Sequence, residues 1–186
     1  MRRLIASEFV TLDGVMEAPG GEPTHPHTGW VGDLSSDESI TYKLDEVLAA
    51  DTLLVGRVTY ESFAEAWPAR TGPFADQMNG MPKLVASTTL TDPAWENTTV
   101  LEGDVAAAVE AEKAKDGGPI LLAGSCSLLH TLLGAGLVDE LRLMVFPVSI
   151  GSGLRVFPDT QAKMTFSLAE CRQFSNGVLA LTYLRA

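Results

Sequence analysis

The sequence predicts an α/β fold, in which a mainly parallel central sheet carries helices on both faces and ends in a C-terminal antiparallel hairpin. Short apolar segments alternate with segments of helical periodicity up to Val148, a pattern typical of βαβ units. Near the C-terminus, Asn176-Gly177 separates two strand-like segments, which is a strong hairpin signal. The length of 186 residues fits a single domain, residues 1–186.

The first third of the chain is predicted to hold a buried strand, a long loop and an amphipathic helix. The strand falls within residues 2–12. Residues 13–34 contain five of the 17 glycines and three of the ten prolines, so they form a loop of a length that is often functional. Ser35 followed by Glu38 fits a capping box, and residues 37–50 then show helical spacing of apolar side chains.

The middle of the chain alternates strands and helices, and the end is a hairpin. Strands are expected at residues 52–56, 83–87, 98–101, 119–123 and 137–148, and the hairpin strands at 165–174 and 178–185. Helices are expected at residues 59–66, at 73–80, from the N-cap Asp104 to Lys115, and after Gly124-Ser125.

Composition and charge exclude several classes of protein. The net charge of −11 and pI of 4.6 disfavour general nucleic-acid binding, because an acidic surface repels phosphate backbones. No apolar run approaches the ~18 residues of a membrane span. Two cysteines form neither a disulfide framework nor a metal knuckle, and His25 and His27 lack a third ligand, so we expect no metal site and a cytoplasmic location.

Known nucleophile and nucleotide motifs are missing, but one local geometry occurs twice. The Gly-x-Ser-x-Gly, Walker and Gly-x-Gly-x-x-Gly patterns are absent. In residues 55–59 and again in residues 123–127, a predicted buried strand ends at a glycine, and a predicted helix follows directly. Such helix N-termini attract anions, and Arg57, Ser87 and Thr88 add donors at neighbouring strand ends. Two interpretations remain open: a ligand with several phosphates, or glycines that merely permit tight turns.

Four blocks of sequence resemble one family over nearly the whole chain. They read SEFVTLDGVMEAPGG, ADTLLVGRVTYESFAEAWP, MPKLVASTTL and ILLAGSCSLLHTLLGAGLVDELRLMVFPVSIGSG. Their order and spacing are similar to those of the dihydrofolate reductase-like superfamily, and specifically of stand-alone RibD C-terminal domains, which are riboflavin-biosynthesis reductase-like proteins.

This resemblance implies that the chain binds NADPH. Gly56, Arg57 and Thr59 would hold the cofactor phosphates, and Ser87 and Thr88 would lie beside the adenosine ribose and its 2′-phosphate. The remaining positions implied for the cofactor are Ala6 near the nicotinamide, and the glycine turn and helix start at Gly124, Ser125, Ser127 and Leu128. Asp13-Gly14 would begin a mobile covering loop, and Trp30 would line the pocket of cofactor and substrate.

The implied activity is an NADPH-dependent reductase that transfers a hydride to a small heterocyclic or imine/carbonyl substrate, pterin-like or ribosylaminopyrimidine-like. Asp13 is a candidate proton donor, with a bound water, Asp33, Asp37 or Glu38 as alternatives; Asp13 alternatively stabilises its turn. Two alternative hypotheses are an NADP(H)-binding module without turnover and a flavin-using reductase. Relatives are commonly dimers, so we expect a homodimer.

Two departures from the riboflavin enzymes bear on the substrate. Those enzymes are often fused to a zinc deaminase, and no deaminase sequence occurs here. Many also carry an acidic residue shortly before the glycine turn, where this chain has Leu121-Leu122-Ala123. Neither the riboflavin intermediate nor folate is therefore fixed as the substrate.

Overall fold

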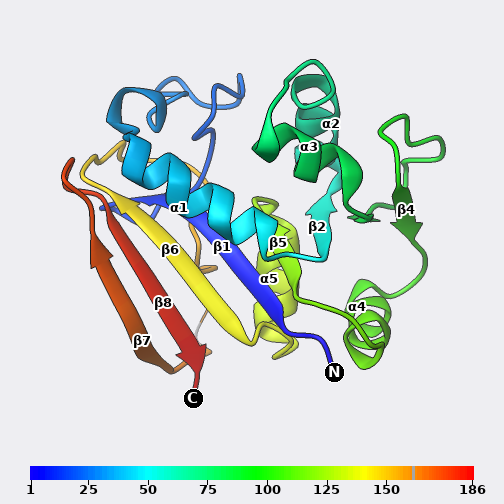
Figure 1. The fold of residues 1–186 in the computed structure, drawn as a ribbon. Coiled ribbons are helices and arrows are strands. Elements are labelled where there is room, and N and C mark those ends of the chain that lie inside the picture. The colour runs from blue at the N-terminus through cyan, green and yellow to red at the C-terminus, as the bar shows by residue number, and fades with distance from the viewer. Residues whose placement is uncertain (161) are drawn as a thin grey trace.

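The computed structural model describes residues 1–160 and 162–186, and the described residues form one mixed sheet of eight strands (Figure 1). The strand order across the sheet is β4-β3-β2-β5-β1-β6-β8-β7. The strands are β1 (Leu4–Thr11), β2 (Thr52–Gly56), β3 (Lys83–Ala86), β4 (Thr98–Leu101), β5 (Ile120–Ala123), β6 (Glu140–Phe146), β7 (Phe166–Gln173) and β8 (Leu179–Arg185).

The first six strands run parallel, and the last two close the sheet as an antiparallel hairpin. β1 lies at the centre, where Ser7 pairs with Ala123 of β5 on one side and with Arg142 of β6 on the other. β8 pairs antiparallel with both β6 and β7. The predicted α/β fold with its C-terminal hairpin is therefore confirmed.

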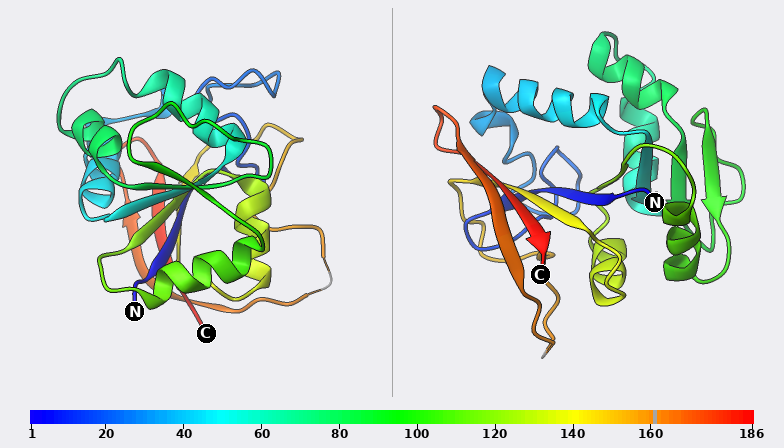
Figure 2. Two further views of the ribbon diagram at one scale, coloured as in Figure 1. Left: turned by 90° about the vertical axis from the view of Figure 1, so that its right-hand side faces the viewer. Right: turned by 60° about the horizontal axis from the view of Figure 1, so that its bottom comes forward.

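Helices cover both faces of the sheet, as the right-hand view of Figure 2 shows for α1 and α3 on one side and α4 and α5 on the other. The helices are α1 (Asp37–Leu48), α2 (Arg57–Ala66), α3 (Pro73–Gly80), α4 (Val105–Ala114) and α5 (Cys126–Gly134). Alternate residues of β1 point to opposite faces, so Ile5 packs in a core cluster with α1 to α3 and Leu4 in a cluster with α5.

α1 begins at Asp37 as predicted, but its predicted capping box is wrong by one residue, and the predicted start of the second helix is wrong by two. The capping box of α1 uses Ser36 and Ser39 rather than Ser35 and Glu38: the Ser36 hydroxyl accepts the Ser39 N–H at 3.2 Å. The Glu38 carboxylate instead accepts the backbone N–H of Ser175 at 2.8 Å, across to the hairpin turn. The second helix begins at Arg57, not Thr59, because Gly56 already serves as its N-cap. Sequence patterns miss such shifts because neighbouring serines fit a cap equally well.

The long loop at residues 13–34 is tied down at several points. It contains a short 3-10 helix, η1 (Gly32–Leu34). Trp30 Nε1 donates to the Glu17 carbonyl at 2.9 Å, and Val15 forms an antiparallel bridge with Arg155. The loop therefore packs against the segment that follows β6.

Within the described residues, no helix has the length and apolar character that a membrane crossing requires.

Candidate functional site

A cleft of ≈ 930 Å³ runs along the edge of the sheet where β1, β2, β3 and β5 end. Its floor includes Phe9, Gly56, Ala86 and Ala123 from these four strands, and the loop at residues 13–34 contributes to its wall. Ligands of open α/β sheets bind at this edge, and the volume is typical of a cofactor or small-molecule site. The cleft is therefore the candidate active site.

Two glycine turns meet inside the cleft and bond to each other. The Gly56 N–H donates to Ser125 Oγ at 2.7 Å, and the Ser125 hydroxyl donates to Thr59 Oγ1 at 2.9 Å. Gly124 has φ +62°, and a Cβ there would lie 3.2 Å from Thr59 Cγ2. Glycine is needed at Gly124 for both reasons, and the two turns form one unit.

Two helices begin at these turns with their first N–H groups uncapped by any side chain. The N-cap residues of α2 and α5 are Gly56 and Ser125, and neither makes a side-chain cap bond. In contrast, the Asp104 carboxylate caps α4 by accepting the Ala107 N–H at 2.8 Å. A negative ligand group is therefore attracted to α2 and α5, where no N-cap side chain occupies the first N–H groups.

Most residues expected to hold a cofactor do lie on this cleft. The lining includes Gly56, Arg57, Thr59, Ser87, Thr88, Gly124, Ser125, Ser127 and Leu128. The Arg57 guanidinium forms a half-exposed pair with Glu61 at 2.9 Å, and Ser87 Oγ accepts the N–H of Leu90 at 2.9 Å. Their contact with a cofactor stays a prediction.

Three other expected site residues, Ala6, Trp30 and Asp13, lie outside the lining of the cleft. Ala6 is fully buried in the core cluster with α5 and does not line the cleft. Trp30 packs edge-on against Phe146 with ring centroids 5.5 Å apart, and it lines a separate hollow of ≈ 340 Å³ with Asp33 and Ile150. The ring is therefore outside the lining of the large cleft, a position that depends on contacts of the loop with residues distant in sequence.

Asp13, the expected proton donor, is engaged in a turn outside the cleft lining. Its carboxylate accepts the Thr11 hydroxyl at 2.6 Å and the Gly151 N–H at 2.7 Å. The Thr11 hydrogen bond, and then that from Gly151, lower the pKa of Asp13 well below its usual value. A lowered pKa favours the ionised form, and these hydrogen bonds agree with the alternative role of Asp13 as a turn stabiliser; its role as proton donor stays a prediction.

The sequence interpretation missed Glu8, a carboxyl group buried beside the glycine turn. Glu8 Oε2 accepts the Gly124 N–H at 3.0 Å, while Oε1 has no partner among the described residues. Burial raises the pKa of Glu8 well above its ordinary value, and Lys43 opposes this shift. A glutamate in the middle of the apolar strand LIASEFVT was the available signal, because buried carboxylates are rare without a specific role.

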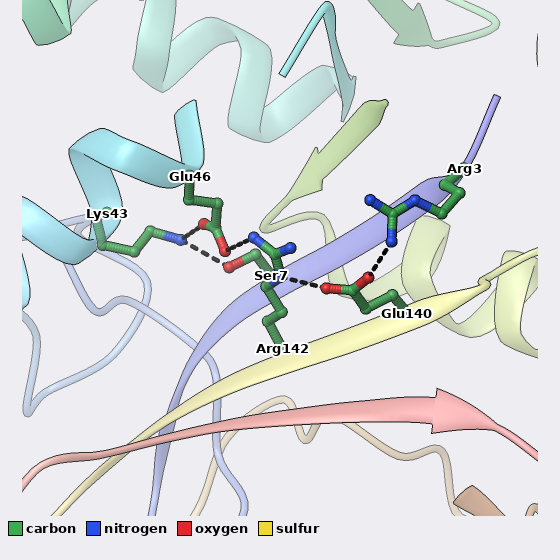
Figure 3. Close-up of polar contacts among 6 residues, drawn as sticks. All are labelled: Arg3, Ser7, Lys43, Glu46, Glu140 and Arg142. Carbon is green, nitrogen blue, oxygen red and sulfur yellow. Dashed lines mark hydrogen bonds and ion pairs between the residues drawn. The ribbon is translucent and has the colours of Figure 1, made fainter. Parts of the chain in front are cut away.

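Beside this group, five charged side chains form a chain of ion pairs on the α1 face of the sheet (Figure 3). Lys43 pairs with Glu46, Glu46 pairs with Arg142 at 3.2 Å, Arg142 pairs with Glu140 at 2.6 Å, and Glu140 pairs with Arg3 at 3.0 Å. Burial alone would raise the pKa of Glu46, but Lys43 and then Arg142 lower it. We call these residues the charge chain: Arg3, Lys43, Glu46, Glu140 and Arg142.

The cleft also contains Cys126, which contacts His130. Cys126 Sγ lies 3.4 Å from His130 Nε2 and 3.3 Å from the Arg155 carbonyl oxygen. Burial is the main cause that raises the pKa of the Cys126 thiol, so this pair does not present a reactive thiolate. Among residues 1–160 and 162–186, no three His, Cys, Asp or Glu side chains are grouped to hold a metal ion.

Comparison with protein families gives a match over almost the full chain. The model of the RibD C-terminal domain matches residues 2–180. Two similar relatives come from Bacillus subtilis (strain 168). The uncharacterized protein YyaP is 30% identical, with 98% of this chain and 94% of the relative covered. The uncharacterized protein YwjB is 25% identical, with coverage of 100% and 99%.

Solved structures share the fold. A protein of Shewanella sp. PV-4, assigned provisionally to riboflavin biosynthesis, superposes with a TM-score of 0.77 at 19% identity, covering 99% of both chains. A pyrimidine reductase-like protein of Corynebacterium diphtheriae superposes with a TM-score of 0.71 at 14% identity, covering 100% of this chain and 92% of the other. At these identities the likeness establishes the fold, and function has to be argued from the site.

Proposed function

The chain belongs to the RibD C-terminal domain family, and from this premise we propose that it is an NADPH-dependent reductase acting on a small heterocyclic or imine/carbonyl substrate. The names of the similar structures, a riboflavin biosynthesis protein and a pyrimidine reductase-like protein, agree with a reductase-type role.

One observation carries the proposal: two uncapped helix N-termini meet over paired glycine turns in a single large cleft. Each N-terminus presents free N–H groups and the positive end of a helix dipole, which suits a phosphate group. Two of them bonded together through Ser125 suit two linked phosphates, as in a dinucleotide.

The residues at this edge fit a phosphorylated nicotinamide dinucleotide. Gly56 and Gly124 let the two turns pack closely, because an added Cβ would lie 3.3 Å from Ser125 or 3.2 Å from Thr59, respectively. The close packing brings the N-termini of α2 and α5 together, which suits a pyrophosphate. Arg57, Ser87 and Thr88 supply a cation and two hydroxyls farther along the same edge, and these suit the additional phosphate of NADPH.

When bound, such a cofactor supplies the hydride, and the chain supplies binding, orientation and exclusion of water. The loop at residues 13–34 contributes Met16, Ala18 and Pro19 to the wall, an apolar cover that limits water at the reacting centre. No nucleophilic side chain is required, which agrees with the absence of nucleophile motifs in the sequence.

Titration of the purified chain with NADPH, followed by nicotinamide fluorescence and by calorimetry, tests the proposal. Binding followed by NADPH oxidation with a pterin, a ribosylaminopyrimidine or a quinone would support a reductase. Binding without oxidation of any acceptor would favour an NADP(H)-binding module, and a yellow preparation would indicate a flavin. No binding at millimolar NADPH would overturn the proposal.

A further inference from the structure

The end of the cleft next to β1 and α1 differs from the glycine turns in being lined by side chains. Ser7 and Phe9 of β1 point to the α1 face of the sheet, where they meet Lys43 and Val47, and Val31 of the loop completes this wall. We call this set the acceptor wall: Ser7, Phe9, Val31, Lys43 and Val47. The function proposed above leaves this end for the substrate, because the phosphate-binding features lie at the turns.

We propose that Lys43 binds an anionic oxygen of the substrate, so that the acceptor is a planar molecule carrying a carboxylate or an ionised ring oxygen. This inference rests on the proposed reductase function and names the class of its substrate.

The first support is the number of hydrogen-bond donors on Lys43. An ammonium group has three N–H donors. Within the described part of the chain, Lys43 Nζ donates to Ser7 Oγ at 2.7 Å and to Glu46 Oε2. Its side chain is only 14% exposed, and it lines the cleft, so the remaining donor has the cleft as its available space.

The second support is the charge balance of the charge chain, which alternates in sign and begins and ends with a cation (Figure 3). The Glu46 carboxylate is shared between Lys43 and Arg142, and Glu140 is shared between Arg142 and Arg3. Three cations and two carboxylates leave one positive charge in excess. Arg3 is 61% exposed and is solvated by water, whereas Lys43 faces the cleft.

The other acids of the cleft do not supply the missing negative charge. Burial, the largest effect, raises the pKa of Glu8 and favours its neutral form. Glu17 Oε2 accepts the Leu154 N–H at 2.9 Å, and Glu22 Oε2 accepts the Gly20 N–H at 2.9 Å, so both loop carboxylates are directed to backbone groups. An anionic substrate group is the remaining way to complement Lys43.

The shape of the acceptor wall indicates the rest of the substrate. Lys43 Nζ lies 5.2 Å from the centroid of the Phe9 ring, so a group held by Lys43 lies next to an aromatic face. Val31 and Val47 add aliphatic surface. Aromatic and aliphatic walls around one fixed cation suit a flat ring with an acidic substituent.

The experiment compares benzoate with benzamide, two probes that share a ring and differ in charge. Their affinities for the full chain are measured by ligand-observed NMR, in the wild type and in Lys43→Met, Lys43→Arg and Lys115→Met. Lys115 is the matched control, because it also pairs with an acid three residues away, Glu112, but is 60% exposed at the C-cap of α4. We expect the wild type to bind benzoate about tenfold more tightly than benzamide.

This preference should disappear in Lys43→Met and persist in Lys43→Arg and Lys115→Met. Equal binding of the two probes, no benzoate binding at millimolar concentration, or a preference that persists in Lys43→Met would overturn the proposal. If Lys43→Met does not fold, wild-type chain labelled with ¹³C at lysine Cε decides: benzoate must shift the Lys43 resonance, identified as the signal missing from Lys43→Arg.

The result is separable from the reductase proposal, because NADPH affinity is titrated independently on the same samples. Lys43→Met should bind NADPH as the wild type does. A wild type that binds benzoate through Lys43 but no NADPH would refute the reductase alone.

Discussion

The two ends of the cleft differ in the chemical groups that line them. At the glycine turns, the site consists of backbone N–H groups, two glycines and the hydroxyls of Ser125 and Thr59. At the acceptor wall, it consists of charged side chains held by one another, from Lys43 through Glu46 to Arg142. A Cβ added at a glycine should disrupt the end at the glycine turns, whereas neutralising one charged side chain should disrupt the end at the acceptor wall.

This difference also separates binding from stability. The helix N-termini exist whether or not a ligand is present, because their N–H groups belong to the helices themselves. The charge chain is part of the folded interior, since Glu46 is 2% exposed and shared by two cations. Changes at the turns should therefore affect ligand binding, and changes in the charge chain should affect folding as well.

The largest effect is expected from Glu46→Gln. This change removes a buried carboxylate that the half-buried Lys43 and Arg142 share, and the loss of one partner from a buried ion pair costs about 3 kcal/mol. Urea denaturation measures the change. Glu61→Gln, which removes a half-exposed carboxylate from the pair with Arg57, is the control and should stay within about 0.5 kcal/mol of wild type. Equal stabilities of the two variants would show that the buried Glu46 contributes no more to the free energy of unfolding than the half-exposed Glu61.

The next largest effect is expected from Gly124→Val. A branched side chain at φ +62°, with its Cβ 3.2 Å from Thr59 Cγ2, forces the two turns apart. We expect NADPH affinity to fall about 100-fold, which is about 2.7 kcal/mol, with the benzoate preference at Lys43 retained. Calorimetry provides the measurement, and Gly134→Val, at the other end of α5 where a Cβ meets open space, is the control. Wild-type NADPH affinity in Gly124→Val would contradict the role of the turns.

A smaller effect is expected from Arg57→Ala, which removes a cation from the same end of the cleft. NADPH affinity should fall about tenfold, and NADH affinity less, because NADH lacks the additional phosphate. The effect should weaken as salt is added, since the Arg57 side chain is 44% exposed. Arg185→Ala, at the end of β8 and outside the cleft lining, is the control. Equal losses for the two cofactors would place Arg57 away from the additional phosphate.

The smallest effect is expected from Glu8→Gln, which keeps the shape of the side chain. Burial raises the pKa of Glu8 above its ordinary value of 4.5, so the folded chain holds a proton that the unfolded chain releases as pH rises. Wild-type stability should therefore decline, relative to Glu8→Gln, as pH rises from 4.5 toward the raised pKa. Urea denaturation across this range tests the sign. A stability difference that does not change with pH would mean that Glu8 is ionised in the fold.

Local signals predicted most of the fold. Alternation of apolar runs with helical periodicity located the helices and strands to within a few residues, as at Lys83–Ala86 for the expected strand at 83–87. Asp104 is the N-cap of its helix, and Asn176-Gly177 forms the hairpin turn, as predicted. These features depend on residues close in sequence, whose propensities hold in most tertiary contexts.

The same local signals predicted only the end of the candidate site that is formed by the glycine turns. Strand-glycine-helix segments are contiguous, so residues 55–59 and 123–127 were recognisable, and the structure brings them together. Asp13 and Trp30 belong to a loop whose path depends on contacts with Gly151 and Phe146, more than a hundred residues away. Their positions therefore could not be predicted from neighbouring residues.

By itself, then, the sequence determined the α/β fold and the backbone-built end of the cleft, because both arise from short contiguous patterns of apolar residues, glycines and caps. Only the tertiary structure decided that Glu8 is buried beside Gly124 and that Lys43, Glu46 and Arg142 form one chain of charges. Ion pairs act over a few ångströms in space, and the parallel register that aligns Ser7 with Arg142 joins residues that no sequence pattern connects.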